Sequence, residues 1–216
     1  LYIINFHAKF FNSYLTILSE LNIAIFALMV LKFYKYQGTG NDFIIVDNRN
    51  LIFDKNNSLL IQKLCNRKTG VGSDGLILLE NHKNLDFKMV YFNADSSESG
   101  FCGNGSRCIT HFAKFLGIVK DSARFEAIDG IHQAKIIDDV ISVKMNNIDA
   151  LKIKHFNNGY NATFVDSGSP HLLIQKSDIN NFDIIDESKS IKNHFKKNFT
   201  KGVNINYFSV SNEEVN

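Results

Sequence analysis

The chain has 216 residues, of which 44% are hydrophobic and 21% are charged, and this composition is typical of a folded globular protein and excludes a disordered one. The formal net charge is only +2, with basic residues scattered among acidic neighbours, so no binding surface for nucleic acid is predicted. Three cysteines form an odd set without a credible signal peptide, which favours free thiols in a reducing compartment such as the cytoplasm.

The first feature in chain order is an apolar N-terminal segment. Residues 21–31 (LNIAIFALMVL) are too few to span a bilayer, which takes about 20 apolar residues. No small-x-small cleavage site follows, and no arginine precedes Arg49, which disfavours a signal or transit peptide. We therefore expect residues 1–28 to be upstream sequence outside the native protein, with Met29 as its start. The alternative is a genuine membrane anchor, but no association with a membrane is predicted.

From residue 31 onward, the sequence predicts short strands and two helices. An apolar run at residues 43–47, bounded by glycines and Asn48, predicts a buried strand. Ser58 is a suitable N-cap for a helix over residues 59–68, and Gly70 follows as its stop. Further strands are predicted at residues 76–80, 87–92, 124–128, 132–137 and 140–145, the last three as a meander of hairpins.

The second predicted helix covers residues 106–116 and ends before Gly117, which suits the C′ position. Its apolar residues cover a broad face, which indicates little solvent exposure. A second region is expected from residue 146 onward, with strands at residues 163–166, 171–175 and 204–210. This order of helices and strands favours an α+β fold whose sheets wrap a central helix.

Four stretches combine glycines with polar side chains and so depart from core-building sequence. They are residues 37–43 (QGTGNDF), 69–75 (TGVGSDG), 93–107 (NADSSESGFCGNGSR) and 167–171 (SGSPH). The second stretch contains G-x-G-x-x-G, but that pattern binds a dinucleotide only between a strand and a following helix. Here the predicted helix precedes the loop and a strand follows it, so a nucleotide site is disfavoured.

Cys102 lies in the most informative stretch, at the start of the second predicted helix. Unpaired N–H groups and the helix dipole favour a thiolate there, so we expect a pKa for Cys102 below the ordinary thiol value of about 8.5. Gly103 and Gly105 let the backbone form an anion-binding nest that suits an α-carboxylate. The ligand's α-carbon would then lie near the sulfur, where a thiolate can remove the α-proton or a thiol can return one.

Other roles for Cys102 fit less well. A nucleophilic cysteine needs a histidine base, and His111 lies nine residues along the same predicted helix, out of reach. A zinc site needs cysteines at short spacing, which the six-residue step to Cys108 does not provide, so no metal is predicted. Cys65 and Cys108 fall on apolar helix faces as core residues, which is the more frequent fate of any free cysteine.

Six motifs in order resemble those of the diaminopimelate epimerase family. They are residues 38–43 (GTGNDF), 70–75 (GVGSDG), 92–95 (FNAD), 102–107 (CGNGSR), 167–171 (SGSPH) and 202–204 (GVN). Together they cover roughly residues 29–210. No single motif is decisive, but the six in sequence are highly specific.

The resemblance implies interconversion of LL- and meso-2,6-diaminoheptanedioate in lysine and peptidoglycan precursor synthesis, without a cofactor or metal. Two cysteines on opposite faces of the α-carbon exchange its proton, and Cys102 matches the first of them. The implied fold has two similar lobes, each a mixed sheet wrapped around a central helix, and the implied assembly is a cytoplasmic homodimer when full length. The residues that match substrate-binding positions are Asn41, Asn93, Gly103, Asn104, Asn204 and Ser169.

Two departures from the family pattern matter. Ser169 stands where many members have an asparagine, which leaves a shorter hydrogen-bonding side chain. The second catalytic cysteine, in a glycine-rich loop after a Glu-Arg pair, would lie beyond Asn216, so we expect the isolated chain to be unable to epimerise. The implied division is an N-terminal epimerase lobe at residues 29–145 and a partial C-terminal lobe at residues 146–216.

Two rival functions stay open. One is another two-thiol enzyme, such as a proline racemase or an epimerase of a different amino acid, although the asparagines suit a substrate with a second, distal amino acid group. The other is a non-catalytic truncated homologue that only binds, and the intact Cys102 loop counts against it. A panel of substrates discriminates the first rival, and substitution of Cys102 tests the second.

Overall fold

The computed structural model describes residues 12–17, 29–150, 153–157, 159–179, 181–200, 202–211 and 214–215. Of the apolar segment at residues 21–31, only the last three residues fall within this described part. The chain divides into two compact units, Leu1–Lys144 and Met145–Asn216. Among the helices that the structure describes, none is long and apolar enough to cross a membrane.

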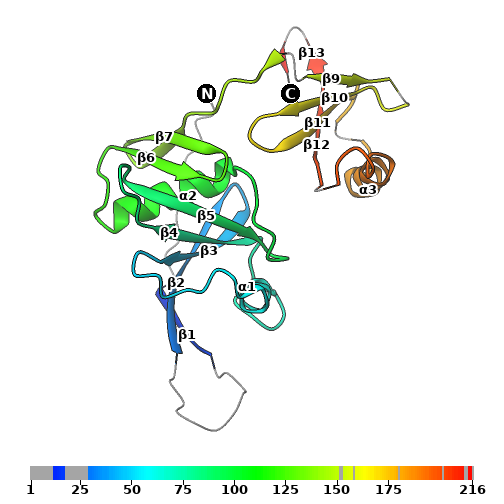
Figure 1. Cartoon of the computed structure of the whole chain (residues 1–216). Helices are drawn as coiled ribbons and strands as arrows, with labels where there is room; N and C mark the ends of the chain where they lie inside the picture. Colours follow the sequence, from blue (N-terminus) through cyan, green and yellow to red (C-terminus); the bar gives the residue numbers. More distant parts are fainter. Residues whose placement is uncertain are drawn as a thin grey trace. The chain divides into compact units, whose positions relative to one another are not determined.

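The first unit contains one mixed sheet in which the strands follow one another in chain order (Figure 1). The strands are β1 (Asn12–Ile17), β2 (Met29–Gly38), β3 (Asn41–Asp47), β4 (Gly75–Glu80), β5 (Phe87–Asn93), β6 (Ser122–Ala127), β7 (Gly130–Ile137) and β8 (Val140–Val143). Neighbours are antiparallel except β3–β4 and β5–β6. Those two pairs are parallel because a helix connects each of them, α1 (Ser58–Cys65) and α2 (Gly103–Phe115).

Strand β3 is buried on both faces of the sheet. Phe43 and Ile45 pack in the core that contains α2, whereas Ile44 and Val46 pack in the core that contains α1. Successive side chains of a strand point to opposite faces, so a strand covered on both sides reads as a continuous apolar run. The strand predicted at residues 43–47 is confirmed.

Helix α2 packs against the curled sheet. It contacts β2 and β8, which lie near opposite ends of the strand order, as well as β3, β4 and β5 between them. Its inner face carries the fully buried Cys108, Ile109 and Phe112, which confirms the predicted apolar helix face. The helix ends at Phe115, and Gly117 adopts φ of 72°, as expected of a glycine at C′.

Tight turns set the register of two hairpins. Thr39 and Gly40 between β2 and β3 have φ of 55° and 82°, and Asp138 and Asp139 between β7 and β8 have φ of 47° and 63°. Two central residues with positive φ are characteristic of the type I′ turn, whose twist matches that of paired strands. The predicted meander of β6, β7 and β8 is confirmed as two antiparallel pairs.

Helix α1 differs from its prediction at both ends. Its N-cap is Asn57, whose side chain accepts a hydrogen bond from the N–H of Leu60, and Ser58 is the first helical residue. The helix ends at Cys65, short of the predicted residue 68, because Asn66 has an extended backbone. The Oδ1 of Asn66 accepts hydrogen bonds from the backbone N–H groups of Lys68 and Thr69, which stabilises a turn in place of further helix.

The second unit contains a smaller mixed sheet with the strand order β12-β11-β10-β9. Its strands are β9 (Lys154–Phe156), β10 (Ala162–Asp166), β11 (Pro170–Gln175) and β12 (Asn204–Phe208). A separate pair, β13 (Val210–Ser211) and β14 (Glu214–Val215), follows. The strand predicted at residues 204–210 is thus divided between β12 and β13.

A third helix, α3 (Ile184–His194), connects the parallel strands β11 and β12. The sequence prediction of two helices missed it, because Ile191 is the only residue within α3 that is buried. The sequence nevertheless contained an N-cap residue for this helix, Asp183. Its side chain accepts hydrogen bonds from the N–H groups of Ile185 and Asp186. In the described residues, the fold is therefore α+β with two mixed sheets, one of them curled, and three helices.

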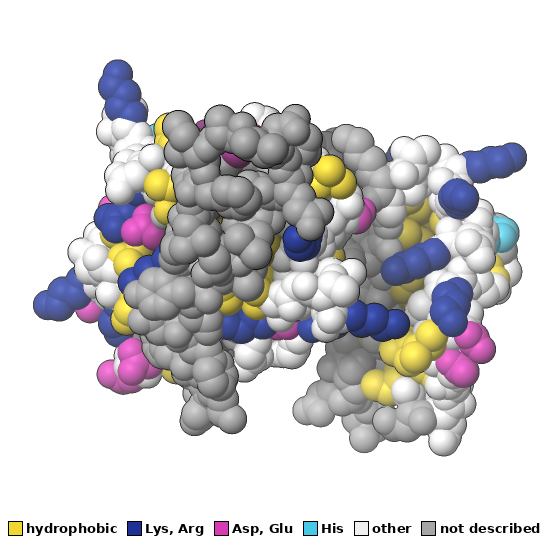
Figure 2. Space-filling view, turned by 90° about the horizontal axis from the view of Figure 1, so that it is seen from below, with side chains coloured by type: hydrophobic (Ala, Val, Ile, Leu, Met, Phe, Trp, Pro, Cys, Tyr) yellow, Lys and Arg dark blue, Asp and Glu magenta, His cyan; other side chains and the backbone are white. Residues whose placement is uncertain are grey.

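The surface carries charges of both signs. On the face shown in Figure 2, the described lysine and arginine side chains stand among acidic and neutral ones. This agrees with the formal net charge of +2.

Candidate active site

Cys102 is the N-cap residue of α2. Its backbone is extended, with φ of −121° and ψ of 108°, and its Sγ accepts a hydrogen bond from the N–H of Gly105 at 3.3 Å. The helix therefore begins at Gly103, not at residue 106 as predicted. A helix leaves its first N–H groups without backbone partners, and the sulfur satisfies one of them. The predicted anion-binding nest is accordingly the first turn of α2 itself.

Gly105 allows the start of α2 to lie directly on the sheet. A Cβ at this position would lie 3.0 Å from Cδ1 of Ile77 in β4 and 3.2 Å from Cε of Met89 in β5. Both distances are tighter than ordinary carbon contacts, so a larger residue would displace these side chains. The glycine thus fixes how closely Cys102 approaches the strands.

The sheet register brings the glycine-containing loops together beside Cys102. Phe43 pairs with Gly75, and Gly75 in turn pairs with Asn93. The loops that precede β3 and β4 and the loop that follows β5 therefore lie at one end of the sheet. Gly75 is needed there, because a Cβ would lie 2.5 Å from the carbonyl oxygen of Phe92.

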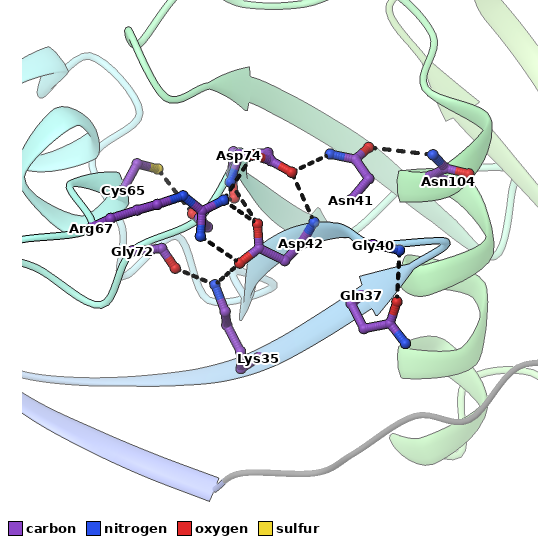
Figure 3. Close-up of polar contacts among 12 residues, drawn as sticks. Lys35, Gln37, Gly40, Asn41, Asp42, Cys65, Arg67, Gly72, Asp74 and Asn104 are labelled. Carbon is purple, nitrogen blue, oxygen red and sulfur yellow. Dashed lines mark hydrogen bonds and ion pairs between the residues drawn. The ribbon is translucent and has the colours of Figure 1, made fainter. Parts of the chain in front are cut away.

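The side chain of Asn41 lies next to the Cys102 sulfur, and the side chain of Asn104 contacts Asn41. The Oδ1 of Asn41 is 3.8 Å from Sγ of Cys102, which suits a weak S–H hydrogen bond. The same oxygen is 3.5 Å from Nδ2 of Asn104 (Figure 3). The Oδ1 of Asn104 accepts hydrogen bonds from Oγ1 of Thr39 at 3.1 Å and from the guanidinium group of Arg107. The structure thus brings Asn41 to the thiol and Asn104 to Asn41. Gly103, between Cys102 and Asn104 in the chain, is the first residue of α2.

A charged network lies behind Asn41. The Nη2 of Arg67 is 2.6 Å from Oδ1 of Asp42 and 2.8 Å from Oδ1 of Asp74, and Nζ of Lys35 is 2.8 Å from Oδ2 of Asp42. Burial alone would raise the pKa of Asp42, but hydrogen bonds from Arg67 and Lys35 outweigh it and hold that pKa well below its usual value. The Nδ2 of Asn41 donates to Oδ2 of Asp74 at 2.7 Å, which joins the network to the thiol.

The Cys102 thiol is harder to ionise than the sequence suggested. Burial raises its pKa above the ordinary value, and Asp74 contributes in the same direction. The N–H groups of Gly105 and Asn104 and the charge of Arg107 lower the pKa, but not enough to offset burial. The prediction of a lowered pKa is therefore wrong for the ligand-free chain, in which Cys102 is a thiol at neutral pH.

Asn93 lies at the same end of the sheet but has other partners. Its Nδ2 donates to Oγ of Ser97 at 3.2 Å, and its backbone N–H donates to the Ser97 carbonyl at 2.9 Å. These bonds close the polar turn after β5 that the FNAD motif begins. A substrate-binding role for Asn93 stays a prediction.

The remaining predicted residues belong to the second unit. Asn204 begins β12 and pairs in register with His171 of β11. The Oγ of Ser169 is 3.0 Å from Nε2 of His171, and Nδ2 of Asn206 is 2.8 Å from its Nδ1. The shorter side chain of Ser169, in the connection between β10 and β11, thus contacts β11 of its own unit. The binding roles of Ser169 and Asn204 stay predictions.

The sequence reasoning gave no role to Lys35, Arg67 and Asp74. Asp74 lies inside a motif that was noted for its glycines and polar side chains together, and its carboxylate among glycines was a usable signal of its own. Lys35 and Arg67 carried no signal. Lys35 meets Asp42 only through the register of β2 and β3, and Arg67 meets Asp42 and Asp74 only because the loop after α1 folds against them.

The other cysteines are core residues, as predicted. Cys65 and Cys108 are free and buried, and burial raises the pKa of both thiols. Cys102 is half-buried, which makes it the accessible cysteine of the three. Among the residues that the structure describes, no group of three or more His, Cys, Asp and Glu side chains could hold a metal ion.

Comparison with known proteins decides the family. The model of the family described as diaminopimelate epimerase matches residues 33–151, more than half of the chain. The chain belongs to the diaminopimelate epimerase family. The prediction made from the six motifs is therefore confirmed.

Individual diaminopimelate epimerases match over most of the chain. The enzyme of Flavobacterium psychrophilum is 50% identical over 163 residues, which are 75% of this chain and 62% of that protein. The enzyme of Chlorobaculum tepidum is 36% identical over 181 residues, 81% of this chain and 68% of that protein. The chain thus spans about two thirds of the length of these relatives.

Solved structures show the same fold at low sequence identity. A probable proline racemase from Agrobacterium radiobacter, solved with bound carbonate, has a TM-score of 0.59 at 11% identity over 86% of this chain and 68% of that one. A phenazine biosynthesis protein of the PhzF family from Bacillus anthracis has a TM-score of 0.58 at 14% identity, covering 85% and 68%. These likenesses show that proteins other than diaminopimelate epimerases share the fold of this chain, and they show nothing beyond the fold.

Proposed function

We propose that this protein interconverts LL- and meso-2,6-diaminoheptanedioate in the cytoplasm, without a cofactor, as a step of lysine and peptidoglycan precursor synthesis. The observation that carries the proposal is the half-buried Cys102 thiol at the N-terminus of α2, beside the Asn41 amide, in a member of the diaminopimelate epimerase family. Because the chain spans 62% of the F. psychrophilum enzyme, the activity is assigned to the protein that contains these residues.

The first turn of α2 suits the substrate's α-carboxylate. Its N–H groups and the positive end of the helix dipole attract an anion. Gly103 leaves the approach open, because a Cβ there would meet only Nη1 of Arg107, at 3.9 Å. A carboxylate held here places the α-carbon beside Sγ of Cys102 and lets its oxygens take up charge when the α-proton leaves.

Cys102 transfers a proton at one face of the α-carbon. In one direction its thiolate takes the α-proton, so that the Cα–H bond breaks and an S–H bond forms. In the other direction its S–H bond breaks, and the proton returns to the carbanion with inversion. The raised pKa of Cys102 means that the ligand-free protein holds the proton-donating form.

A second thiol must act from the opposite face of the α-carbon. Cys65 and Cys108 are 2% and 0% exposed and pack in the cores under α1 and α2, so neither can reach a ligand. We assign the second thiol to the part of the protein that its relatives have beyond the matched region. That the isolated 216-residue chain does not epimerise stays a prediction.

We further propose that the second unit begins a second lobe similar to the first, each lobe wrapping its sheet around a helix, in a homodimer. The order of elements supports this likeness. In the first unit, the antiparallel pair β2–β3 is followed by α1 and the parallel strand β4. In the second unit, the antiparallel pair β10–β11 is followed by α3 and the parallel strand β12. Asn204, at the start of β12, then occupies the place that corresponds to the start of β4.

Chiral chromatography of product mixtures tests the function. The complete gene product is incubated with LL-2,6-diaminoheptanedioate and, separately, with proline, hydroxyproline and glutamate. We expect meso product from the first substrate only, no turnover by Cys102→Ser, and turnover retained by the matched control Cys108→Ala from the same helix. Turnover of another amino acid instead would favour the rival racemase. Binding of diaminoheptanedioate without turnover would favour the binding-only homologue.

A further inference from the structure

We propose that Asp74 is a positioning residue that holds the Asn41 amide with its carbonyl oxygen toward the Cys102 sulfur. The contacts form one chain. The Oδ2 of Asp74 accepts a hydrogen bond from Nδ2 of Asn41 at 2.7 Å (Figure 3), and Oδ1 of Asn41 lies 3.8 Å from Sγ of Cys102. This inference rests on the proposed function only for the role of Cys102. The geometry itself does not depend on which amino acid is turned over.

The carboxylate decides which way the Asn41 amide points. An ionised carboxylate can only accept hydrogen bonds, whereas a side-chain amide has a donor end and an acceptor end. With Asp74 at 2.7 Å, the NH₂ group must face the carboxylate. The opposite orientation would place the amide oxygen against a carboxylate oxygen and lose a charge-assisted hydrogen bond.

Asp74 is itself held in place from several sides. Its Oδ2 also accepts from the backbone N–H of Asp42 at 3.1 Å, and its own N–H donates to the Asp42 carbonyl at 3.0 Å. Arg67 bridges the carboxylates of Asp74 and Asp42. The guanidinium group is 58% exposed, so either ion pair alone contributes little to stability. The ion pairs with Arg67 and the backbone hydrogen bonds with Asp42 together fix the orientation of the Asp74 carboxylate.

The orientation of Asn41 matters because the two ends of an amide favour opposite states of a thiol. The carbonyl oxygen accepts a hydrogen bond from S–H and repels a thiolate. An NH₂ group in the same place would donate to a thiolate and stabilise it. Asp74 therefore favours the protonated, proton-donating form of Cys102 through Asn41. The other charged or titratable groups that act on the sulfur are Arg107 and Cys108 of α2 and Tyr91 of β5, beside the N–H groups of Gly105 and Asn104.

The test is a double-mutant cycle read by the pH dependence of Cys102 alkylation. Iodoacetamide reacts with the thiolate, so the rate at Cys102, measured by peptide mass spectrometry, reports the thiol pKa. In the Asp74→Asn variant the Asn41 amide can turn, so the midpoint of the alkylation profile moves to lower pH. Each pH unit of this shift makes alkylation at neutral pH about tenfold faster. In an Asn41→Ala background, the same substitution shifts the midpoint less, because only the direct effect of the Asp74 charge remains.

The cycle separates positioning from a direct charge effect. An equal shift with and without Asn41 means that Asp74 acts on the sulfur by charge alone, and this result overturns the proposal. No shift from Asp74→Asn in the wild-type background overturns it as well. Asp47→Asn is the matched control, because Asp47 also pairs with an arginine and lies in β3, at the opposite end from Asn41. We expect this variant to leave the midpoint unchanged.

A second measurement needs no substitution at Asp74. In the nuclear Overhauser spectrum of the unsubstituted protein, the Nδ2 protons of Asn41 should lack cross-peaks to the β-protons of Cys102. Such cross-peaks would show the reversed amide and contradict the proposal. Neither readout depends on turnover, so failure of the proposed function and failure of this inference are distinguishable.

Discussion

The Sγ of Cys102 accepts a hydrogen bond from the N–H of Gly105 at 3.3 Å, so the side chain proposed to transfer protons also caps the helix that carries it. One atom thus serves stability and chemistry. Substitutions at this position can separate the two roles, because serine is a good N-cap and alanine is not.

Cys102→Ala should destabilise the chain, whereas Cys102→Ser should not. Losing an N-cap hydrogen bond costs about 1 kcal/mol of unfolding free energy, and a serine hydroxyl keeps the bond to the helix N–H. Urea denaturation of the three proteins measures the difference. Asn57→Ala, which removes the cap of α1, is a reference for the size of the loss. Equal stability of the alanine and serine variants would show that the sulfur is not the cap.

Gly105→Ala should destabilise the protein more than Gly103→Ala. A Cβ at Gly105 would lie 3.0 Å from Ile77 and 3.2 Å from Met89, and overpacking of this kind costs about 1–3 kcal/mol. At Gly103 a Cβ would make only an ordinary contact, at 3.9 Å from Nη1 of Arg107, and the higher helix propensity of alanine is worth up to about 1 kcal/mol. Thermal or urea unfolding checks the order. A Gly105→Ala variant as stable as Gly103→Ala would contradict the close approach of α2 to the sheet.

Alkylation of Cys102 in the unsubstituted protein should be slow at neutral pH. Its pKa is raised by burial, so the thiolate forms only above the ordinary thiol pKa of about 8.5. Arg107→Gln removes a charge that lowers this pKa, and the midpoint should move to still higher pH. Reaction rates with iodoacetamide across pH 6–10 give both midpoints. A midpoint below the ordinary value would restore the prediction made from the sequence.

Asp42 should make the protein sensitive to acid. Its folded-state pKa lies below the unfolded value of about 3.9, so its ion pairs stabilise the native state above that pH. This stability is lost as pH falls from the unfolded pKa toward the folded one. Asp42→Asn should therefore lower the unfolding free energy at pH 7. Below pH 4, the difference in unfolding free energy between this variant and the unsubstituted protein should become smaller. A gap that stays constant with pH would mean that the ion pairs contribute nothing.

The parts of the fold that could be predicted from the sequence are those that local pattern determines. Strand β3 is a bounded apolar run, and α2 has a broad apolar face and a glycine at its end. Helix α3 was missed because only one of its residues, Ile191, is buried, and one buried residue gives the sequence no helical period of apolar positions. Strand β2 was missed because its alternating residues directly follow an apolar segment that obscures their period.

In the candidate site, too, some residues could be predicted from local sequence and others depend on the folded chain. The glycine pattern around Cys102 and the resemblance pointed to Asn41 and Asn104, and both are neighbours of the thiol. The pKa of Cys102 could not be predicted, because burial of its sulfur depends on how α2 meets β4 and β5. The contact between Asp74 and Asn41 joins the residue before β4 to the first residue of β3, and it exists only through the register of these two strands.

The most direct test of the central claim, that Cys102 exchanges the α-proton, is deuterium incorporation from D₂O. The complete gene product is incubated with LL-2,6-diaminoheptanedioate in D₂O, and α-deuterium is measured by mass spectrometry. Our account predicts that the meso product carries deuterium at the inverted carbon, and that Cys102→Ser, which keeps the helix cap, gives neither meso product nor this exchange. Inversion at an undiminished rate in Cys102→Ser would contradict the account.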